Sequence, residues 1–529
     1  MHKPNFSSND YWLVDVRLNI KTTRDKISNP FAISLANNVF GKPKNTFLDL
    51  VDKEKFIRDI FNKRGATADD AGLISRAISK LAGDMYSDLS ERFVFELLQN
   101  ADDMPKDKNG VNVKLHLLEN NILFIHNGLP FSKEDIKAIT DIGNSTKKKN
   151  PSQTGYKGIG FKIVFQESEN VLIKSGGFSF SFDKNTTDVA IAINTDRVNQ
   201  FRTDITSLIQ EPRFILFLRN IKSIKIDGIN NPIEITKTKS EKAISLKSNN
   251  EHLSDWLTFD DIEIKISEEV KEAILSDKAV PPKLKEISST KLNFICQLVD
   301  GKIIPVAPEE SYLFTYLPTD VKDYKFPFLV NADFLTTANR QSIHVKNKWN
   351  LFLFEEIGKN CLKWIAEVSN SSYKASAYNL LPNSESSVND QPWEAFYKGY
   401  TKAIDETEFV LSESGKLVKL KDVCIDNTGF SKYVDSLTFK TLFSLQGELL
   451  SNEITDVNPI VCTVEEFGQG KIIKITDLIQ SISNENFKAW LTNPANNIVF
   501  IRYLINNRLL DLLASNELFL SKDLKLFES

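Results

Sequence analysis

The hydrophobic period of the chain changes where Pro105 ends a helical block, and this change constrains the fold more than any other sequence feature. From about 50 to 103 the chain reads as helical, with Ile74 and Ile78 on one apolar stripe. Residues 111–117 (VNVKLHL) then alternate apolar and polar side chains, as a half-exposed strand does. A helical block followed by such strands predicts an α+β fold with a mostly antiparallel sheet. Further strands are expected at 122–125, 171–174, 178–182 and 189–193.

The length of 529 residues predicts about two to four domains. We expect an N-terminal extension (1–50), a two-layer α/β domain (51–240), a second α/β domain (241–370) and a mixed α/β C-terminal region (371–529). The last segment is charged and lacks an obvious helix cap, as in a fragment of a longer protein. Beyond 240 we expect strands at 262–266, 292–299 and 312–316, helices at 268–275, 349–368 and 393–404, and a hairpin turning at Ser414–Gly415.

Charge and cysteine usage exclude several classes of protein. The chain has 66 basic and 70 acidic residues, so no global basic field indicates nucleic-acid binding, although a local patch stays open. Its four cysteines are far apart and have no metal-ligand spacing. The N-terminus lacks the apolar core of a signal peptide, and no apolar run reaches about 18 residues. We therefore expect a cytoplasmic protein without membrane spans.

A polar stripe interrupts the apolar helix ERFVFELLQNADD. Glu96, Asn100 and Asp103 are spaced i, i+4, i+7 and lie within roughly 60° of one another on a helix. Val94 and Leu98 belong to the opposite, apolar side. A stripe of this kind is usually a solvated face. Its position in the most apolar helix of the region favours a binding site instead.

Two glycine features follow that helix. Asn127–Gly128 ends a strand as a turn, and Gly128 would let the backbone approach a ligand closely. The segment 154–165 (TGYKGIGFKIVF) is a glycine-rich loop entering a helix, an arrangement that offers N–H groups to phosphates. It matches neither the P-loop nor the dinucleotide-binding pattern. Each feature alone is equally typical of an ordinary turn or loop.

Three motifs in this order resemble the Bergerat ATPase fold of gyrases, heat-shock chaperones, histidine kinases and mismatch-repair proteins. The motifs are LSERFVFELLQNADD, HNGLPFSKEDIKAITDIGNSTKK and TGYKGIGFKIVF. They look most like its sacsin-like branch, which includes plant NO VEIN proteins and bacterial relatives. The likeness extends through YLFTYLPT and FPFLVNADFLTTANRQSIHVKNKWN, roughly Leu73 to Asn350. It implies that 51–240 is a Bergerat-type ATPase domain and 241–370 a transducer-like domain.

The resemblance also implies ATP and Mg²⁺ as cofactors. Glu96 matches the base that activates the attacking water, Asn100 the ligand of Mg²⁺, and Asp103 a further acid of the nucleotide-binding helix. The residues that match the ATP lid and phosphate loop are Ser145, Thr146, Lys147, Gly155, Lys157, Gly158, Ile159, Gly160, Phe161 and Lys162.

One position departs from the family pattern, and the role of a second stays open. Other branches carry an Asp for the adenine amino group where this chain has His126, and Asn127 or a bound water is the candidate for that contact. Arg340 matches the basic residue with which related transducer domains reach the γ-phosphate. A surface ion pair explains Arg340 equally well.

The leading functional hypothesis is an ATP-driven conformational switch in a chaperone-like or prokaryotic anti-phage defence role, with a protein partner and a plausible homodimer. The alternative is a nucleotide-binding scaffold with little turnover that assembles or gates an effector. None of the five histidines falls on a predicted dimerising helix, which argues against a sensor histidine kinase. The near-neutral charge argues against a DNA-clamping ATPase.

Overall fold

The structure, a computed structural model, places most of the chain in two compact units. The first unit is Met1–Leu298 with Pro308–Leu353, and the second is Val299–Ala307 with Phe354–Ser529. The residues it describes are 12–18, 52–53, 55–60, 90–117, 121–140, 168–175, 178–183, 205, 211–229, 231–277, 280–337, 342–383, 388–509, 511–512, 516–521 and 523–527.

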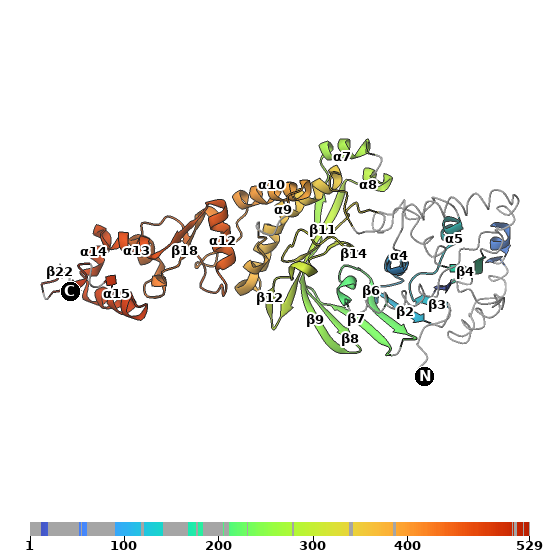
Figure 1. Ribbon diagram of the computed structural model, residues 1–529, viewed down its shortest axis with the longest axis horizontal. Helices are drawn as coiled ribbons and strands as arrows, with labels where there is room; N and C mark the ends of the chain where they lie inside the picture. Colours follow the sequence, from blue (N-terminus) through green and yellow to red (C-terminus); the bar gives the residue numbers. More distant parts are fainter. Residues whose placement is uncertain are drawn as a thin grey trace. The chain divides into compact units, whose positions relative to one another are not determined.

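One large mixed sheet organises the first unit (Figure 1). Its strands lie in the order β14-β13-β15-β11-β9-β8-β7-β6-β2-β3-β1-β4-β5, and β10 pairs with β11. Most neighbours are antiparallel, but β2 and β6 run parallel, as do β13 and β15. The bounds are β1 (Trp12–Leu18), β2 (Val111–Leu117), β3 (Asn121–His126), β4 (Ser168–Ser175), β5 (Phe178–Asp183), β6 (Ile221–Asp227), β7 (Ile233–Lys239), β8 (Ala243–Ser248), β9 (Glu251–Thr258), β10 (Ile262–Lys265), β11 (Ser289–Val299), β13 (Leu313–Thr315), β14 (Leu317–Pro318) and β15 (Leu329–Ala332).

Burial in β2 explains why an alternating sequence becomes a strand. Every second side chain is buried, and those between are half-buried, because successive residues of a strand face opposite sides of the sheet. The helix α4 (Ser90–Asp102) packs against β2. The fully buried apolar residues of this layer include Val94, Leu97, Leu98 and Ala101 of α4 and Val111, Val113, Leu115 and Leu117 of β2.

The remaining helices of the first unit are short. They are α5 (Lys133–Thr140), the 3-10 helix η4 (Pro212–Ile215), α7 (Glu268–Leu275), α8 (Pro282–Glu286) and the 3-10 helix η5 (Pro308–Glu310). Ser267 caps α7, since its hydroxyl accepts a hydrogen bond from the Val270 N–H, and two glutamates occupy the first turn. The long helix α9 (Lys348–Ser369) begins in the first unit and continues into the second.

In the second unit, α9 and α10 (Gln391–Glu406) cross at two glycines. A Cβ on Gly399 would lie 2.0 Å from the Glu355 carbonyl oxygen, and one on Gly358 would lie 2.2 Å from that of Phe396. No residue other than glycine fits this crossing without backbone movement. Farther along, Phe430 centres an aromatic core with Phe487, Phe500 and Tyr503.

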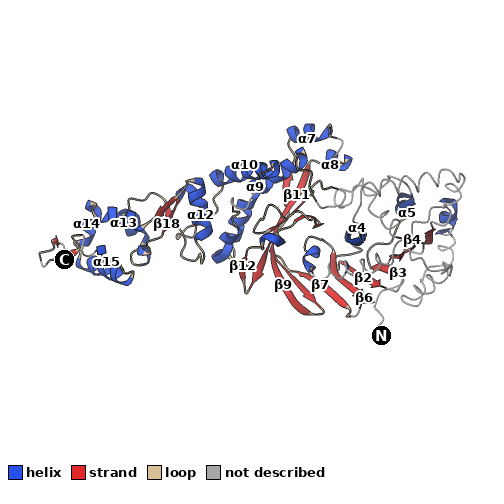
Figure 2. Cartoon of the chain, viewed as in Figure 1, coloured by secondary structure: helices blue, strands red, loops and turns tan. Residues whose placement is uncertain are grey.

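The other elements of the second unit are short helices and strands (Figure 2). β19, β18 and β20 form a parallel sheet in that order, and β16 and β17 form a hairpin. The bounds are β12 (Lys302–Ile304), η6 (Lys374–Leu380), β16 (Val410–Leu411), β17 (Leu417–Val418), η8 (Leu420–Asp422), β18 (Val423–Asp426), η9 (Phe430–Lys432), α11 (Ser436–Leu442), β19 (Glu448–Leu449), α12 (Asn458–Phe467), β20 (Lys471–Ile473), α13 (Ile475–Ile482), α14 (Glu485–Leu491), α15 (Pro494–Asn506), β21 (Phe519–Leu520) and β22 (Leu526–Phe527).

The structure confirms the coarse fold prediction of a protein that mixes helices and strands, and it shows one large mixed sheet. The predicted strands at β2 to β5 and the helices at α7, α9 and α10 are present, as is the hairpin turn at Gly415, whose φ is +77°. The Bergerat-type sandwich and the domain bounds stay predictions. The predicted strand at 189–193 lies outside the described residues.

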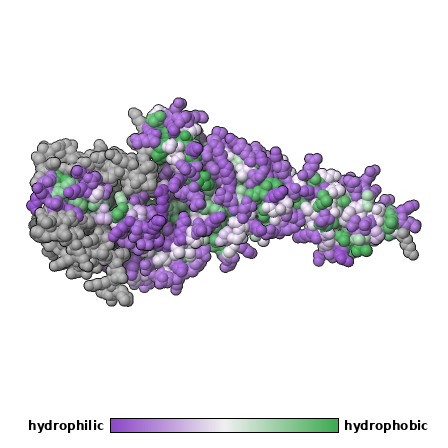
Figure 3. Space-filling view, turned by 180° about the vertical axis from the view of Figure 1, so that it is seen from behind, coloured by the Kyte–Doolittle hydropathy of each residue, from purple (hydrophilic) through white to green (hydrophobic). Residues whose placement is uncertain are grey.

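The sequence analysis missed four consecutive strands, β6 to β9. They form an antiparallel run between 221 and 258. The turn between β8 and β9 is Asn249–Asn250, both with positive φ (49° and 71°), a conformation that asparagine tolerates better than most residues. On the face seen in Figure 3, hydrophilic residues cover most of the described surface. None of the described helices is long and apolar enough to cross a membrane.

Candidate functional site

Between residues 94 and 102, the helix α4 presents two polar residues that are not buried. From 94 to 102, all of which are described, every residue is buried except Glu96 and Asn100, which are half-buried. They are four positions apart and therefore lie one above the other on one side of the helix. The Glu96 carboxylate and the Asn100 amide therefore form a narrow polar strip on a stretch of helix, 94–102, that is otherwise buried.

Asp102, which the sequence analysis did not select, fixes the end of α4. It is 1% exposed, and its carboxylate accepts hydrogen bonds from the backbone N–H groups of Arg219 (2.8 Å), Asn220 (2.7 Å) and Ile221 (2.8 Å). The side chain of Asn220 donates to the Asp102 carbonyl oxygen at 2.7 Å. The carboxylate therefore binds α4 to the segment that enters β6.

A sequence signal for Asp102 did exist. It stands four residues after Leu98, so it falls on the apolar side of the helix and not on the polar stripe. An acid on a buried face needs partners inside the protein. The next residue, Asp103, was the predicted acid, but it is half-buried and its backbone N–H donates to the Gln99 carbonyl at 3.0 Å.

Asp102 and Lys237 of β7 are buried groups of opposite charge that influence each other's pKa. Burial raises the pKa of the Asp102 carboxyl, while the charge of Lys237 and the three backbone N–H groups lower it. Burial also lowers the pKa of Lys237 to about 8, and Asp102 opposes that shift. The ammonium of Lys237 donates to the carbonyls of Ile215, at 3.0 Å, and Leu218. Each charge thus has backbone partners as well as the opposite charge.

The turn after β3 is hydrogen-bonded to the residues that follow α4. Gly128 is the residue that permits it, because a Cβ there would lie 2.3 Å from the Met104 carbonyl oxygen. The same carbonyl accepts a hydrogen bond from the Leu129 N–H at 2.8 Å. The close approach that we predicted for Gly128 is therefore an approach to the protein's own backbone.

His126 and Asn127 have structural contacts at this turn. His126 is 1% exposed, and its Nδ1 accepts a hydrogen bond from the Gly128 N–H at 3.1 Å. Burial lowers the pKa of His126 well below its usual value, so the imidazole is neutral at pH 7. Asn127 Oδ1 accepts from the Asn112 N–H at 2.8 Å, which joins the end of β3 to β2.

The loop from this turn to α5 is also held in place. The Phe131 N–H donates to the Ser175 hydroxyl of β4 at 2.9 Å, and Ser175 is fully buried. Ser132 and Asp135 form a reciprocal capping pair at the start of α5, with Asp135 Oδ2 accepting from the Ser132 N–H at 2.9 Å. The structure therefore brings the carboxyl end of α4, the turn after β3 and the start of α5 together around fixed backbone.

The other predicted site residues lie outside the described residues. The structure describes Glu96, Asn100, Asp103, His126, Asn127 and Gly128. The ones it does not describe are Ser145, Thr146, Lys147, Gly155, Lys157, Gly158, Ile159, Gly160, Phe161, Lys162 and Arg340. On either side of Arg340, Thr336 and Ile343 form an isolated antiparallel bridge.

Comparison with known proteins finds a similarity to a described domain in this part of the chain. Residues 75–205 match the Sacsin domain, a range that contains α4, β2, β3, α5, β4, β5 and the glycine-rich segment. The chain is 25% identical to Protein NO VEIN of Arabidopsis thaliana over 327 residues, which is 54% of the chain and 11% of that protein.

The chain is also similar to Sacsin of Homo sapiens, with 36% identity over 84 residues, 13% of the chain and 2% of that protein. The chain thus spans about a tenth or less of the length of these curated relatives. The comparisons support a sacsin-like and NO VEIN-like relationship.

Proposed function

We propose that this chain binds ATP with Mg²⁺ at the polar strip of α4 and hydrolyses it. The observation that carries the proposal is the exposure of Glu96 and Asn100 on a helix whose other residues from 94 to 102 are buried. The Sacsin-domain match supports it, because the matched range contains both this helix and the glycine-rich segment.

The residues of the strip fit the proposed ligand. Mg²⁺ prefers oxygen ligands, and the Asn100 amide oxygen on a half-buried helix face supplies one, while nucleotide phosphates and water supply others. The Glu96 carboxylate lies one helical turn away, where it would orient and deprotonate a water molecule. Phosphoryl transfer depends mainly on positioning and charge stabilisation, so a metal ligand and a base on one rigid helix meet its main needs.

The rigidity of α4 supports this assignment. Asp102 binds the end of the helix through three backbone N–H groups, and Gly128 brings the turn after β3 against Met104. A site residue is useful only if its position is fixed before the ligand arrives. Both anchors lie within about two helical turns of the strip.

In this proposal hydrolysis drives a conformational switch that acts on a protein partner, in a chaperone-like or anti-phage defence role in the cytoplasm. A ligand shifts a conformational equilibrium only by the difference between its affinities for the two states. Arg340, as a residue that senses the γ-phosphate, and the lid residues between Ser145 and Lys162 stay predictions from the resemblance.

Calorimetric titration of the full chain with Mg·ATP tests the proposal. Wild type should bind in the presence of Mg²⁺ and lose affinity in EDTA, and Asn100→Ala should abolish Mg-dependent binding. Asn109→Ala, an exposed residue in the turn after α4, is the matched control and should bind as wild type does. Equal affinity of wild type and Asn100→Ala would contradict the proposal. Binding without measurable phosphate release would instead favour a scaffold that uses ATP only for assembly.

A further inference from the structure

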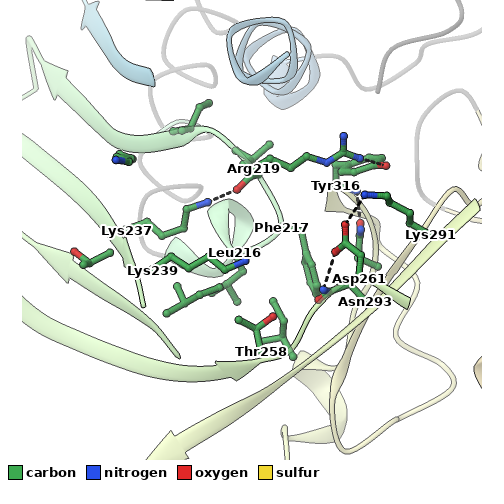
Figure 4. Close-up of a pocket in the computed structure, with 17 residues that line it drawn as sticks. Leu216, Phe217, Arg219, Lys237, Lys239, Thr258, Asp261, Lys291, Asn293 and Tyr316 are labelled. Carbon is green, nitrogen blue, oxygen red and sulfur yellow. Dashed lines mark hydrogen bonds and ion pairs between the residues drawn. The ribbon is translucent and has the colours of Figure 1, made fainter. Parts of the chain in front are cut away.

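The first unit contains a cavity of about 330 Å³ between the strands that follow the Sacsin-domain match (Figure 4). Its lining comes from β6, β7, β8, β9, β11 and β15, from the segment 216–219 before β6, from Asp261 before β10, and from Tyr316 between β13 and β14. We call it the basic cavity, because five basic side chains and one acidic one line it. The basic residues are Arg219, Lys222, Lys237, Lys239 and Lys291, and the acidic one is Asp261.

The charges around the basic cavity favour an anion. Lys291 forms an ion pair with Asp261 at 3.1 Å, which neutralises the acidic group of the lining, and the charge of Lys237 is offset by the buried Asp102. Arg219, Lys222 and Lys239 supply the remaining positive charge of the lining. The Arg219 guanidinium lies over the Tyr316 ring, 4.4 Å from its centroid, and also hydrogen-bonds to the Tyr316 hydroxyl. Lys237, buried at one side, keeps a third ammonium proton beyond the two that bind carbonyls. The excess positive charge in a partly enclosed space attracts phosphate or carboxylate groups.

The side-chain amide oxygen of Asn293 indicates that a ligand of the basic cavity also carries a hydrogen-bond donor. Asn293 is only 8% exposed. Its Nδ2 donates hydrogen bonds to the Phe259 carbonyl (3.3 Å) and to Asp261 Oδ1 (3.0 Å). These two acceptors fix the orientation of the amide, so Oδ1 is an acceptor. Among the described residues no donor lies within hydrogen-bond distance of Asn293 Oδ1. A buried acceptor without a partner costs about 1–3 kcal/mol, which a ligand hydroxyl or amine would recover.

The backbone near the cavity is held in an uncommon conformation. Tyr316 has a φ of +65°, a left-handed value that is costly for an aromatic residue. Its N–H donates to Asn331 Oδ1 at 2.5 Å. Both residues line the cavity, and Figure 4 shows the Tyr316 ring beside Arg219. The hydrogen bond to Asn331 of β15 therefore fixes the position of the Tyr316 backbone at the cavity.

We propose that the basic cavity is a second ligand site, separate from the strip on α4, for a small phosphorylated molecule that carries a hydroxyl group. The phosphate contacts the ammonium groups of Lys239 and Lys237, and the hydroxyl donates to Asn293 Oδ1. A volume of about 330 Å³ lies at the lower end of the range for small-molecule pockets, and a polymer would not fit inside it.

Calorimetric titration of the full chain with three probes tests this proposal: ribose 5-phosphate, inorganic phosphate and ribose. Ribose 5-phosphate should bind with a dissociation constant at or below about 1 mM, and ribose should not bind. Lys239→Gln removes an exposed ammonium and should weaken ribose 5-phosphate binding about tenfold. Lys247→Gln, an exposed lysine of β8 outside the cavity, is the matched control and should leave the affinity unchanged.

Asn293→Leu separates the hydroxyl contact from the phosphate contact. It should weaken ribose 5-phosphate about tenfold and leave inorganic phosphate unaffected. Binding of ribose 5-phosphate by Asn100→Ala at wild-type strength would show that the site is independent of the proposed ATP site. Failure of both phosphate probes to bind at about 10 mM, or equal affinities in wild type and Lys239→Gln, would overturn the proposal. Tight binding of an acidic peptide in place of both phosphates would overturn it too.

Discussion

The polar strip of α4 and the basic cavity are positioned by different kinds of backbone. Glu96 and Asn100 are four residues apart on one helix, so their proximity follows from helical geometry alone. Lys237, Asn293 and Tyr316 come from three separate strands or turns and meet only through the register of the sheet. A site on one helix leaves a sequence pattern, whereas a site assembled across strands leaves almost none.

Glu96→Gln gives the largest expected effect and should act on the α4 strip alone. Replacing a general base by an uncharged isostere should slow ATP turnover by about 10²–10⁴-fold while Mg·ATP still binds. Phosphate release under saturating Mg·ATP measures this. Ribose 5-phosphate binding by the same variant is the control, and it should stay at the wild-type value. Hydrolysis at the wild-type rate would remove Glu96 from the mechanism.

Asp102→Ala should disturb both regions, because Asp102 connects α4 to the chain that enters β6. The change removes the acceptor of three backbone N–H groups and leaves the buried Lys237 charge without its partner. Loss of one member of a buried pair costs about 3–5 kcal/mol of unfolding free energy.

Denaturant unfolding measures the effect, and Asp103→Ala, one residue later and half-buried, is the matched variant with a smaller expected loss. If the two variants were equally stable, the anchoring role of Asp102 would be refuted.

Gly128→Ala tests whether the turn after β3 supports the α4 strip. A Cβ 2.3 Å from the Met104 carbonyl oxygen forces backbone movement, with an expected cost of about 1–3 kcal/mol. Thermal unfolding should record the loss, and Mg·ATP affinity should fall with it, while the phosphate probes of the basic cavity keep their affinity. Leu129→Ala truncates the exposed neighbour and should change neither measurement.

The effect that is smallest per step of the measurement is a pH dependence that belongs to the basic cavity. The pKa of Lys237 is lowered from 10.5 to about 8 by burial, so the protonated lysine destabilises the folded state relative to the unfolded one. This penalty is fully present below about pH 8 and disappears as the pH rises towards 10.5. Within that window Lys237 should add about 1 kcal/mol of stability per pH unit.

The measurement is the difference in unfolding free energy between wild type and Lys237→Met at several pH values, since other groups titrate in both proteins. A difference that is constant across the window would contradict the lowered pKa. Below the window, both proteins should show parallel pH dependence.

The sequence predicted the elements that have a strong period and missed those that depend on distant partners. α7, α9, α10 and β2 to β5 could be predicted because their patterns are local. β6 to β9 were missed because their apolar residues do not alternate strictly: in β6, IKSIKID, the buried isoleucines are at 221, 224 and 226.

The same contrast applies to single residues. Glu96 and Asn100 could be selected from their spacing, but Asp102 could not be assigned its role, because its three partners are more than 100 residues away. His126 and Gly128 were predicted as ligand contacts, which stays a prediction; the structure shows contacts between the two and, for Gly128, with the Met104 carbonyl after α4. A contact that closes a long loop leaves no local trace in the sequence.

The strand order determines which fragments of the chain keep their strand pairs. The Sacsin-domain match covers 75–205, yet β2 and β3 within it pair with β6 and β1 outside it. A fragment cut at those limits would lose β1 and β6 and so expose strand edges on β2, β3 and β4, and unpaired edges promote aggregation. A fragment that keeps these strand pairs therefore runs from Trp12 to at least Asp227, and we expect the matched range alone to be more prone to aggregation than this longer fragment.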